Sequence, residues 1–414
     1  MFFKRVLLGN TPALGLGVLL TFGSSIGQTF FISLFAGEIR SDLNLSHGMF
    51  GTFYSVATLV SAIVFLWLGK FADQFDLTLL GAFTLLALSG SAMLMASADS
   101  LVMLFLSLFG LRLFGQGLCG HVAMTAMARW FSRARGRVLS VTSLGHPIGE
   151  ALLPSLVVFS FTLLTWQEIW VGVSLCIAAV FVPVVFWLGK CVKSRGLDKP
   201  QDEETDTTGM KRVSWSRAQV LRDYRFYQLI PGLLAAPFIM TGVLFHQVHL
   251  VETKSWSLGM FSSCYPLYAA SATGVTLAAG WLVDRFNAVS LLRFYLVPLG
   301  LGLVLLASTD ETYAAPVFMI LMGASAGAAT IVLSALWVEL YGSENLGAIR
   351  SMCFAMLVLS TSIAPGLMGL LLDRGVTLEA QLALSAIYVF ICSLNFAIMT
   401  PVLSITLSPP SSSS

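Results

Sequence analysis

A histidine and a glutamate lie four residues apart inside an apolar stretch, in the segment SLGHPIGEALLP. They are His146 and Glu150, and glycines and prolines flank both. Residues four apart lie on one face of a helix, so an imidazole and a carboxylate would point the same way. Burial raises and a nearby cation lowers the pKa of a carboxylate. Such a pair can exchange a proton when its surroundings change, or it can form a permanent ion pair that only locks helices together.

One arginine, Arg112, lies in another apolar stretch, FGLRLFGQGLCGHVAMTAMARWF. At 1.5 Å per residue it would lie roughly 16 Å from the outer end of a helix, while His146 would lie roughly 14 Å and Glu150 roughly 20 Å from the inner end of the next. An arginine at such depth costs several kcal/mol unless it is paired or hydrated. Arg112 is therefore either a functional cation within reach of this pair or a structural residue bonded to backbone carbonyls.

Four further polar residues lie within or at the ends of apolar stretches. Gln28 offers neutral hydrogen bonds to a solute, and Gln116 follows Arg112 on the same stretch. His246 is either a residue of an outer vestibule that titrates with outside pH or an interfacial residue. Glu339 lies near the inner end of its stretch, and we expect it to pair with a basic loop residue.

Long apolar stretches recur along the whole chain. It has 414 residues, of which 57% are hydrophobic and 11% are charged, whereas soluble domains carry about 25% charged residues. About 20 apolar residues cross a bilayer as a helix. We therefore expect an all-α polytopic membrane protein, with the first helix retained rather than cleaved as a signal peptide. The twelve expected spans are 12–37, 47–69, 76–97, 100–128, 137–164, 167–189, 226–250, 258–281, 289–307, 313–341, 350–372 and 380–405.

The loop charges predict an orientation. With the N-terminus in the cytoplasm, 19 of the 23 lysines and arginines fall on the cytoplasmic side, 3 fall on the other side, and only Arg112 stays inside a span. Cytoplasmic loops carry the excess of basic residues, so both termini are predicted to be cytoplasmic. We expect a multi-pass protein of the cell membrane, which is the inner membrane in a Gram-negative bacterium.

Metal, cofactor and enzyme motifs are not visible in the sequence. The six cysteines are scattered and form no C-x-x-C pair, which argues against a disulfide framework or a metal site. No nucleotide-binding loop, G-x-S-x-G elbow or H-E-x-x-H cluster is present, so neither an enzyme nor a cofactor is predicted.

The sequence predicts that the chain consists of two halves. Residues 191–224 are polar and charged, and they separate a predicted six-helix bundle at 1–190 from a second at 225–407, followed by a disordered tail at 408–414. The two halves are related by an internal repeat. A shift of 211 residues aligns Gly48-Met49-Phe50 with Gly259-Met260-Phe261, Gly69 with Gly280, Asp73 with Asp284, Phe75 with Phe286, and Pro154 with Pro365.

Internal repeats of this kind are typical of secondary transporters, which bind substrate near the midplane between the repeats. The same shift aligns Glu150 with Thr361, so this carboxylate belongs to one half only.

Two motifs of the form G-x-x-x-D carry the repeat, from Gly69 to Asp73 and from Gly280 to Asp284. Their glycines would permit close helix approach. The pair resembles the signature loop of the major facilitator superfamily, G-x-x-x-D-R-x-G-R-R. The second copy keeps the basic residue as Arg285, whereas the first copy has a glutamine there, and both lack the trailing basic run.

The resemblance covers essentially the whole chain and implies twelve helices in two pseudo-symmetric six-helix bundles. It also implies that Asp73 lies near Arg350 and that Asp284 lies near Arg137. We hypothesise that these contacts close a cytoplasmic gate. Alternatively, both loops are ordinary turns with a solvated aspartate.

The fourth and fifth spans also resemble superfamily patterns. Gln116 and its flanking glycines are similar to the fourth-span pattern, with the spacing off by one. Gly145, Pro147 and Gly149 resemble a Gly/Pro-rich motif of superfamily antiporters, in which Glu150 stands where a glycine is usual.

The resemblance implies a secondary active transporter that works as a monomer by rocker-switch alternating access. Its expected partners are a small organic solute, protons and the lipid bilayer, with no nucleic acid. Arg112 favours an anionic solute, and Glu150 with His146 and Arg112 favours proton coupling. Two alternatives stay open: a proton-driven exporter of drugs or metabolites, and a transporter-like membrane sensor that does not transport.

Overall fold

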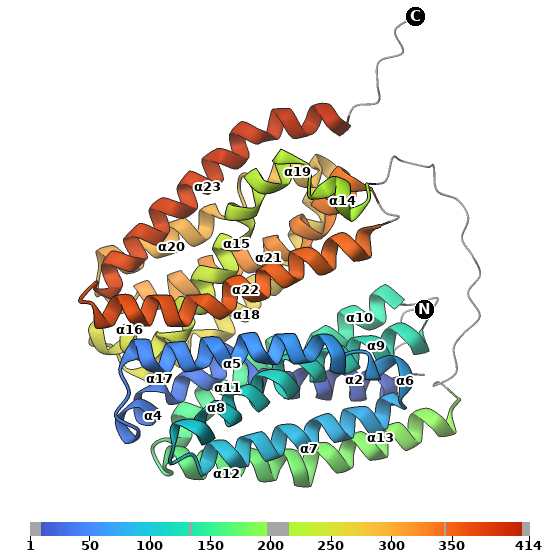
Figure 1. Cartoon of the computed structure of the whole chain (residues 1–414), viewed down its shortest axis with the longest axis vertical. Coiled ribbons are helices and arrows are strands. Elements are labelled where there is room, and N and C mark those ends of the chain that lie inside the picture. Colours follow the sequence, from blue (N-terminus) through green and yellow to red (C-terminus); the bar gives the residue numbers. More distant parts are fainter. Residues whose placement is uncertain (1–9, 132–134, 197–214, 343–344, 408–414) are drawn as a thin grey trace, which may run out of the picture. The chain divides into compact units, whose positions relative to one another are not determined.

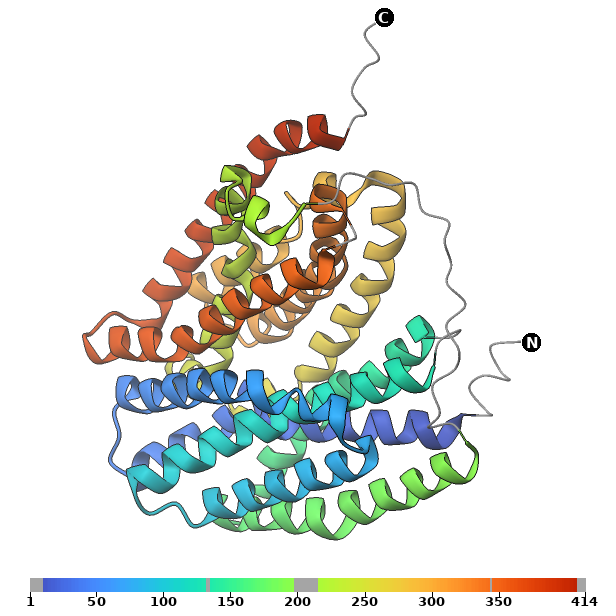
Figure 2. The same ribbon diagram turned by 45° about the vertical axis from the view of Figure 1, so that its right-hand side comes forward.

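The computed structural model describes residues 10–131, 135–196, 215–342 and 345–407. Throughout these residues the regular structure is helical and no β-strand occurs (Figure 1). Figure 2 shows the same helices after a 45° turn. The expected all-α fold is thus confirmed. The predicted tail at 408–414 and residues 197–214 of the predicted linker lie outside the described residues.

The chain divides into two compact units. The first consists of Met1–Asp206 together with Phe245–Val248, and the second of Thr207–Leu244 together with His249–Ser414. The short stretch Phe245–Val248 thus packs with the first unit, although it lies within the bundle predicted at 225–407.

The helices of the first unit are interrupted at several points by 3₁₀ and π turns. The helices are α2 (Thr11–Ser24), η1 (Ser25–Gly27), α3 (Thr29–Ile32), η2 (Ser33–Phe35), α4 (Ala36–Asp42), α5 (His47–Leu68), α6 (Phe71–Gln74), α7 (Leu77–Ala96), α8 (Leu101–Gly110), η3 (Leu111–Cys119), α9 (Gly120–Trp130), α10 (Arg135–Ser143), α11 (Gly145–Ser160), α12 (Trp166–Cys176), η4 (Ile177–Phe181) and α13 (Val182–Ser194).

The second unit contains most of the remaining helices, and the junction of α15 with α16 belongs to the first unit. The helices are α14 (Arg217–Val220), α15 (Tyr224–Phe245), α16 (Gln247–Thr253), α17 (Leu258–Ser262), α18 (Tyr265–Phe286), α19 (Ala288–Leu291), α20 (Val297–Ser308), α21 (Ala314–Tyr341), α22 (Leu346–Asp373) and α23 (Leu378–Leu407).

Nine helical stretches of the described chain are long and apolar enough to cross a membrane, or ten if the bent pair Thr11–Gly27 and Thr29–Asp42 is one span. Two expected spans are shorter than predicted. Residues 137–164 are divided into α10 and α11, and 289–307 are divided into α19 and α20. A proline in the first turn of α20 explains its late start, because proline has no amide to extend a helix backwards. A count of twelve spans therefore stays a prediction.

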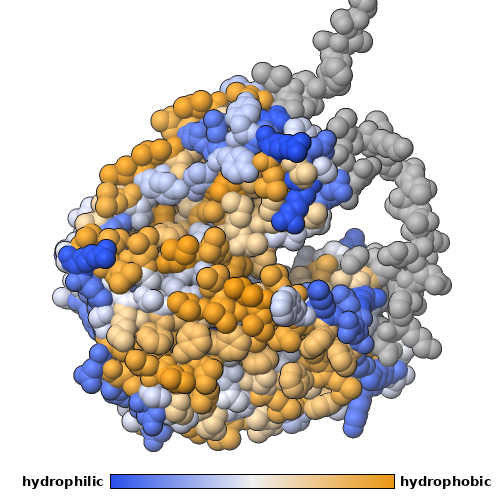
Figure 3. Space-filling model, in the orientation of Figure 1, coloured by the Kyte–Doolittle hydropathy of each residue, from blue (hydrophilic) through white to orange (hydrophobic). Residues whose placement is uncertain are grey.

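Hydrophobic side chains cover the flanks of the helices. Figure 3 shows such residues over most of the face that it displays. Leu277 is 75% exposed and Trp67 is 73% exposed. A soluble monomer rarely exposes apolar patches larger than a few hundred Å², so these side chains fit a lipid environment. This surface agrees with a multi-pass membrane protein.

The 211-residue repeat is visible in how the helices after the two signature loops begin. Asp76 Oδ1 accepts the Leu79 amide at 3.0 Å, and Asn287 Oδ1 accepts the Ser290 amide at 2.9 Å. Asp and Asn at this position satisfy amides that a helix start leaves unpaired. Asp76 also lies 2.9 Å from Lys193 Nζ. Both copies of the repeat thus begin this helix with a cap, while only the first copy adds an ion pair.

Close packing in the second unit rests on two glycines of α21. A Cβ at Gly323 would lie 2.5 Å from the Tyr268 carbonyl oxygen, and one at Gly327 would lie 2.2 Å from the Ala272 carbonyl oxygen. These distances are far below ordinary contact, so only glycine fits. This G-x-x-x-G spacing lets α18 and α21 approach closely, as small residues do in membrane helices.

A buried lysine joins three segments at one end of the second unit. The Lys254 side chain is 1% exposed, and its ammonium lies 2.6 Å from Asp310 Oδ1 and 3.6 Å from Glu379 Oε1. A buried charge is tolerated when it is paired and hydrogen-bonded. Lys254 thereby ties the end of α16 to the loop before α21 and to the start of α23.

Candidate functional site

The helix that carries His146 and Glu150 packs on the first span through glycines. A Cβ at Gly145 would lie 2.2 Å from Thr21 Oγ1, and one at Gly149 would lie 2.2 Å from Ser25 Oγ. Both distances exclude a side chain, so α11 approaches α2 and η1 at backbone distance. The Gly/Pro-rich motif is therefore a packing surface, and it fixes where the neighbouring His-Glu pair lies.

His146 and Glu150 are in contact. His146 Nδ1 lies 3.4 Å from Glu150 Oε2, and the side chains are 37% and 14% exposed. The Phe30 ring meets the imidazole edge to face, with 6.2 Å between ring centres. Ser25 Oγ donates to the His146 carbonyl oxygen at 3.4 Å. The two groups thus share a face as predicted, and the imidazole is the more accessible of them.

Arg112 is buried away from this pair. Its Nε donates to Thr58 Oγ1 at 3.1 Å, one terminal nitrogen donates to the Gly27 carbonyl at 3.0 Å, and its guanidinium carbon lies 5.1 Å from the centre of the Tyr54 ring. No carboxylate of the described residues forms an ion pair with it. Arg112 thus bonds to a hydroxyl and a backbone carbonyl, and no contact with Glu150 is present. Its role toward a solute stays a prediction.

The first span is broken where Arg112 contacts it. The helix axes before and after Gln28 differ by 50°, and Gln28 itself is extended, with φ −84° and ψ 156°. A Cβ at Gly27 would lie 2.2 Å from the Leu111 carbonyl oxygen, so the break touches the π-helix η3. Non-helical backbone at membrane depth occurs where protein buries it or a cavity meets it, and π-helical turns are frequent at functional sites.

Hydrogen bonds and a ring contact connect the break to the seventh span. The hydroxyls of Thr29 and Tyr54 lie 2.8 Å apart, and the Tyr54 ring lies 4.6 Å from the Phe245 ring. Gln247 donates through Nε2 to the Phe30 carbonyl at 2.9 Å. Sequence reasoning missed these partners. A polar residue inside a span, such as Gln247, is the signal that could have found them.

Three other predicted site residues lie at different depths of burial. Gln28 is half-buried, and its Nε2 donates to Ser24 Oγ at 3.3 Å. Gln116 is half-buried on η3. The His246 side chain is buried, with its ring 6.0 Å from the His47 ring. The expected interfacial or vestibule position of His246 stays a prediction.

The first signature loop is held from within its own unit. Arg129, in the last turn of α9, donates to the Asp73 carbonyl oxygen at 2.9 Å and lies 3.2 Å from Asp73 Oδ1. In the second unit Arg350 donates to the Ser334 carbonyl oxygen at 2.9 Å. Arg137 is exposed. The gate contacts expected between Asp73 and Arg350 and between Asp284 and Arg137 stay predictions.

Two expectations at or near the second signature motif, which lies within the last turns of α18, are not met. A Cβ at Gly280 would meet no described atom within 4 Å, so the close helix approach expected there does not occur. Glu339 was expected to pair with a basic residue, but its carboxylate accepts the amides of Ala288 at 2.8 Å and Val289 at 3.2 Å. The free amides at the start of α19 attract a carboxylate. The guanidinium carbon of Arg285 lies 5.5 Å from the centre of the Trp281 ring.

The glycines of the two loops thus differ in their surroundings. At Gly69 the nearest atom to a Cβ would be the Phe65 carbonyl oxygen at 3.1 Å. His121 Nε2 lies 3.1 Å from the Gly69 carbonyl oxygen, and its ring meets Phe65 edge to face. His121 therefore packs the first loop against α9.

Comparison with known proteins places the chain in a family context. The profile described as Major Facilitator Superfamily matches residues 17–365. No curated protein sequence matches the chain. A bacterial homolog of the human lysosomal transporter Spinster, inward-facing and occupied, has a similar structure, with a TM-score of 0.71 and 14% identity over 99% of each chain. The nucleoside transporter NupG, solved as a point mutant, gives a TM-score of 0.69 and 13% identity over 96% of this chain and 100% of its own.

Proposed function

The chain belongs to the major facilitator superfamily of membrane transporters, and we propose that it carries a small anionic organic solute together with protons by rocker-switch alternating access. The observation that carries this proposal is the contact between His146 and Glu150 in the first unit, 3.4 Å apart. Ionisable side chains at membrane depth cost free energy, and those that proteins keep there most often mark a substrate or proton pathway.

The site and the break in the first span lie together. His146 contacts Ser25 and Phe30, and Arg112 contacts Gly27, so both cationic groups touch residues within three positions of Gln28. Discontinuous helices are where secondary transporters hold substrate and coupling ions. An anion that enters here would meet an accessible imidazole and the field of a buried guanidinium.

Proton exchange at Glu150 would couple solute and proton movement. When Glu150 takes up a proton, the pair loses the carboxylate charge, and a protonated His146 is left to an incoming anion. When the anion leaves, the Glu150 carboxylate returns to His146 as the proton departs. Solute and proton thus travel in the same direction. Arg112 supports this exchange from a distance, because its charge has no carboxylate partner among the described residues and a fixed positive charge favours anions.

The test is uptake into proteoliposomes. A melting-shift screen of small mono- and dicarboxylates identifies a solute, whose accumulation is then measured with and without a pH gradient. We expect Glu150→Gln to abolish gradient-driven accumulation and to retain exchange of labelled for unlabelled solute. Glu38→Gln, which removes an exposed carboxylate from α4 of the same unit, should accumulate solute normally.

Two results would contradict the proposal, and a third would favour the exporter. Full gradient-driven accumulation by Glu150→Gln would mean that the proton travels elsewhere. Binding of a carboxylate without any counterflow would instead favour the alternative of a membrane sensor. Proton-driven extrusion of the solute from cells, instead of uptake, would support the exporter, with the same His-Glu pair as its proton site.

A further inference from the structure

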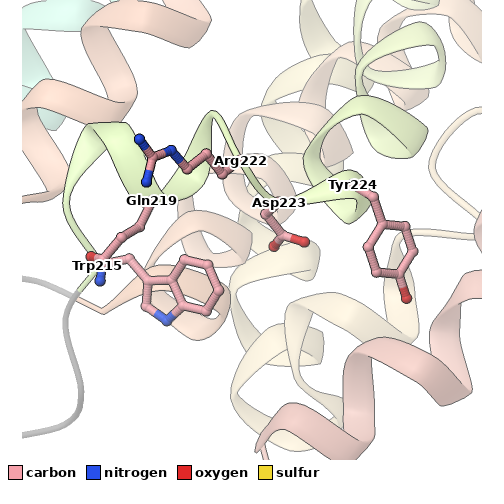
Figure 4. A pocket seen from close by; sticks show the side chains of 5 residues that line it. All are labelled: Trp215, Gln219, Arg222, Asp223 and Tyr224. Carbon is pink, nitrogen blue, oxygen red and sulfur yellow. The ribbon is translucent and has the colours of Figure 1, made fainter.

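The second unit carries a surface pocket that the proposed transport does not use. Its volume is about 360 Å³, and Figure 4 shows the side chains that line it. They belong to the segment 215–224, which begins just before α14 and ends at the start of α15. The loop charges predict that this end of the unit faces the cytoplasm. The lining residues are Trp215, Gln219, Arg222, Asp223 and Tyr224.

The wall of the pocket is fixed by contacts to other helices. The Trp215 amide donates to the Tyr341 carbonyl at 2.9 Å, at the end of α21. Asn345 Nδ2 donates to the Trp215 carbonyl at 3.2 Å, just before α22. A wall that is already ordered loses little entropy when a ligand binds.

The acidic residue of the pocket is already neutralised. Asp223 Oδ1 accepts Arg225 Nε at 2.9 Å, and Asp223 Oδ2 accepts the Tyr341 hydroxyl at 3.2 Å. The side chains of Arg225 and Asp223 are only 14% and 4% exposed. This buried pair therefore offers neither a free carboxylate nor a net charge to a ligand.

The groups that remain available around the pocket are donors. Arg222 is exposed and forms no hydrogen bond or ion pair through its side chain with any residue that the structure describes. Gln219 Oε1 accepts the Ser216 amide at 2.7 Å, which leaves the Gln219 amide nitrogen to donate outwards. Guanidinium and amide donors together suit a phosphate oxygen, and arginine binds phosphate through two parallel hydrogen bonds.

The pocket has aromatic residues of the kind that is common at membrane surfaces. The Trp215 ring lies 5.6 Å from the Tyr341 ring, and Tyr224 is 59% exposed. Tryptophan and tyrosine are enriched where headgroups meet hydrocarbon, and the cytoplasmic leaflet supplies anionic lipids that basic residues attract. We propose that this pocket binds a phosphate group through Arg222 and Gln219, and that the phosphate belongs to the headgroup of an anionic phospholipid.

The experiment compares two arginines of one short segment. Arg222 lines the pocket, whereas Arg217 is also exposed on α14 and does not line it. The full-length protein in detergent is titrated with phosphatidylglycerol, phosphatidylcholine or inorganic phosphate, and bound lipid is counted by native mass spectrometry. We expect Arg222→Ala to weaken phosphatidylglycerol binding about fivefold or more, the factor that one interfacial arginine contributes. Arg217→Ala should bind like the wild type.

A third variant and the phosphate arm complete the test. Arg222→Lys keeps the charge but loses the forked donors, so its affinity should fall between those of the wild type and Arg222→Ala. Displacement of phosphatidylglycerol by millimolar inorganic phosphate would keep the phosphate site but assign it to a soluble ligand. Equal losses in Arg217→Ala and Arg222→Ala would overturn the proposal, because binding would then be general surface attraction. Equal affinity for phosphatidylglycerol and phosphatidylcholine in the wild type would overturn it too.

Discussion

A single methyl group added at Gly145 should separate α11 from α2. The new Cβ would lie 2.2 Å from Thr21 Oγ1, 2.3 Å from the Val18 carbonyl oxygen and 2.7 Å from the Phe22 amide nitrogen. Favourable contact begins near roughly 3.5 Å. Two of the three atoms belong to the backbone and cannot rotate away, so the helices must move apart by about 1 Å in a closely packed interior.

The cost follows from the nature of the clash. Overpacking typically costs about 1–3 kcal/mol, and a clash with backbone belongs at the upper end. For a unit of roughly 200 residues, about 3 kcal/mol corresponds to a fall in melting temperature of roughly 6–12 °C. Gly149→Ala should cost less, because its nearest atoms, at 2.2 Å and 2.6 Å, belong to the side chain of Ser25.

The assay is thermal unfolding of the purified protein in one detergent at one scan rate, since such unfolding is often irreversible. Ser25→Gly should rescue Gly149→Ala, whereas Thr21→Gly should not rescue Gly145→Ala. Gly172→Ala is the control, because a Cβ there meets no described atom within 4 Å and alanine favours the helix by about 1 kcal/mol. The packing argument is refuted if Gly145→Ala melts within about 1 °C of the wild type, a shift of less than about 0.5 kcal/mol.

Three other changes test contacts away from the candidate site, each through the melting temperature. Glu339→Ala should lose about 0.5–2 kcal/mol by removing a helix cap, and Glu339→Gln should lose less; equal losses would exclude capping. Asp310→Asn removes the nearest partner of the buried Lys254, at 2.6 Å, and should be more harmful than Glu379→Gln at 3.6 Å; the reverse order would contradict the clamp. Desolvation raises the pKa of Asp76, but hydrogen bonds from its lysine partner and from backbone amides outweigh this and lower it. Its stabilisation is therefore complete above the unfolded pKa of about 3.9 and is lost as pH falls through the folded pKa. The difference between wild type and Asp76→Asn should be constant from about pH 8 to pH 5 and shrink below about pH 4; a difference that grows on acidification would be incompatible with this sign.

Local patterns predicted those features that depend on neighbouring residues. Membrane helices follow from apolar runs, because each run must cross the hydrocarbon by itself. His146 and Glu150 share a face because a helix repeats every 3.6 residues. Both signature motifs follow from the 211-residue repeat. The first begins at Gly69, the C-cap of α5, whereas the second lies within the last turns of α18 and not in a loop.

Partner choice could not be predicted in the same way. Arg112 was placed near the His-Glu pair from depth alone, but it bonds to Thr58 and to the Gly27 carbonyl, 54 and 85 residues away. The depth of a residue fixes its layer of the membrane, but it does not fix which neighbouring helix its side chain faces. The π-helical turn at η3 and the break at Gln28 determine which helix Arg112 faces, and neither has a strong sequence signal.

The sequence by itself determined that this protein is a helical membrane protein with the superfamily's repeat, and it identified the His146–Glu150 face. These properties arise from hydropathy and helix period, which act over a few residues. Only the tertiary structure decided that Glu339 caps α19 and that Phe245–Val248 joins the first unit. It also decided that Arg112 donates a hydrogen bond to the Gly27 carbonyl oxygen at the break of the first span. Each of these depends on which helices approach closely. That approach is set by glycines whose contacts lie on other helices, so it becomes visible only when the chain is folded.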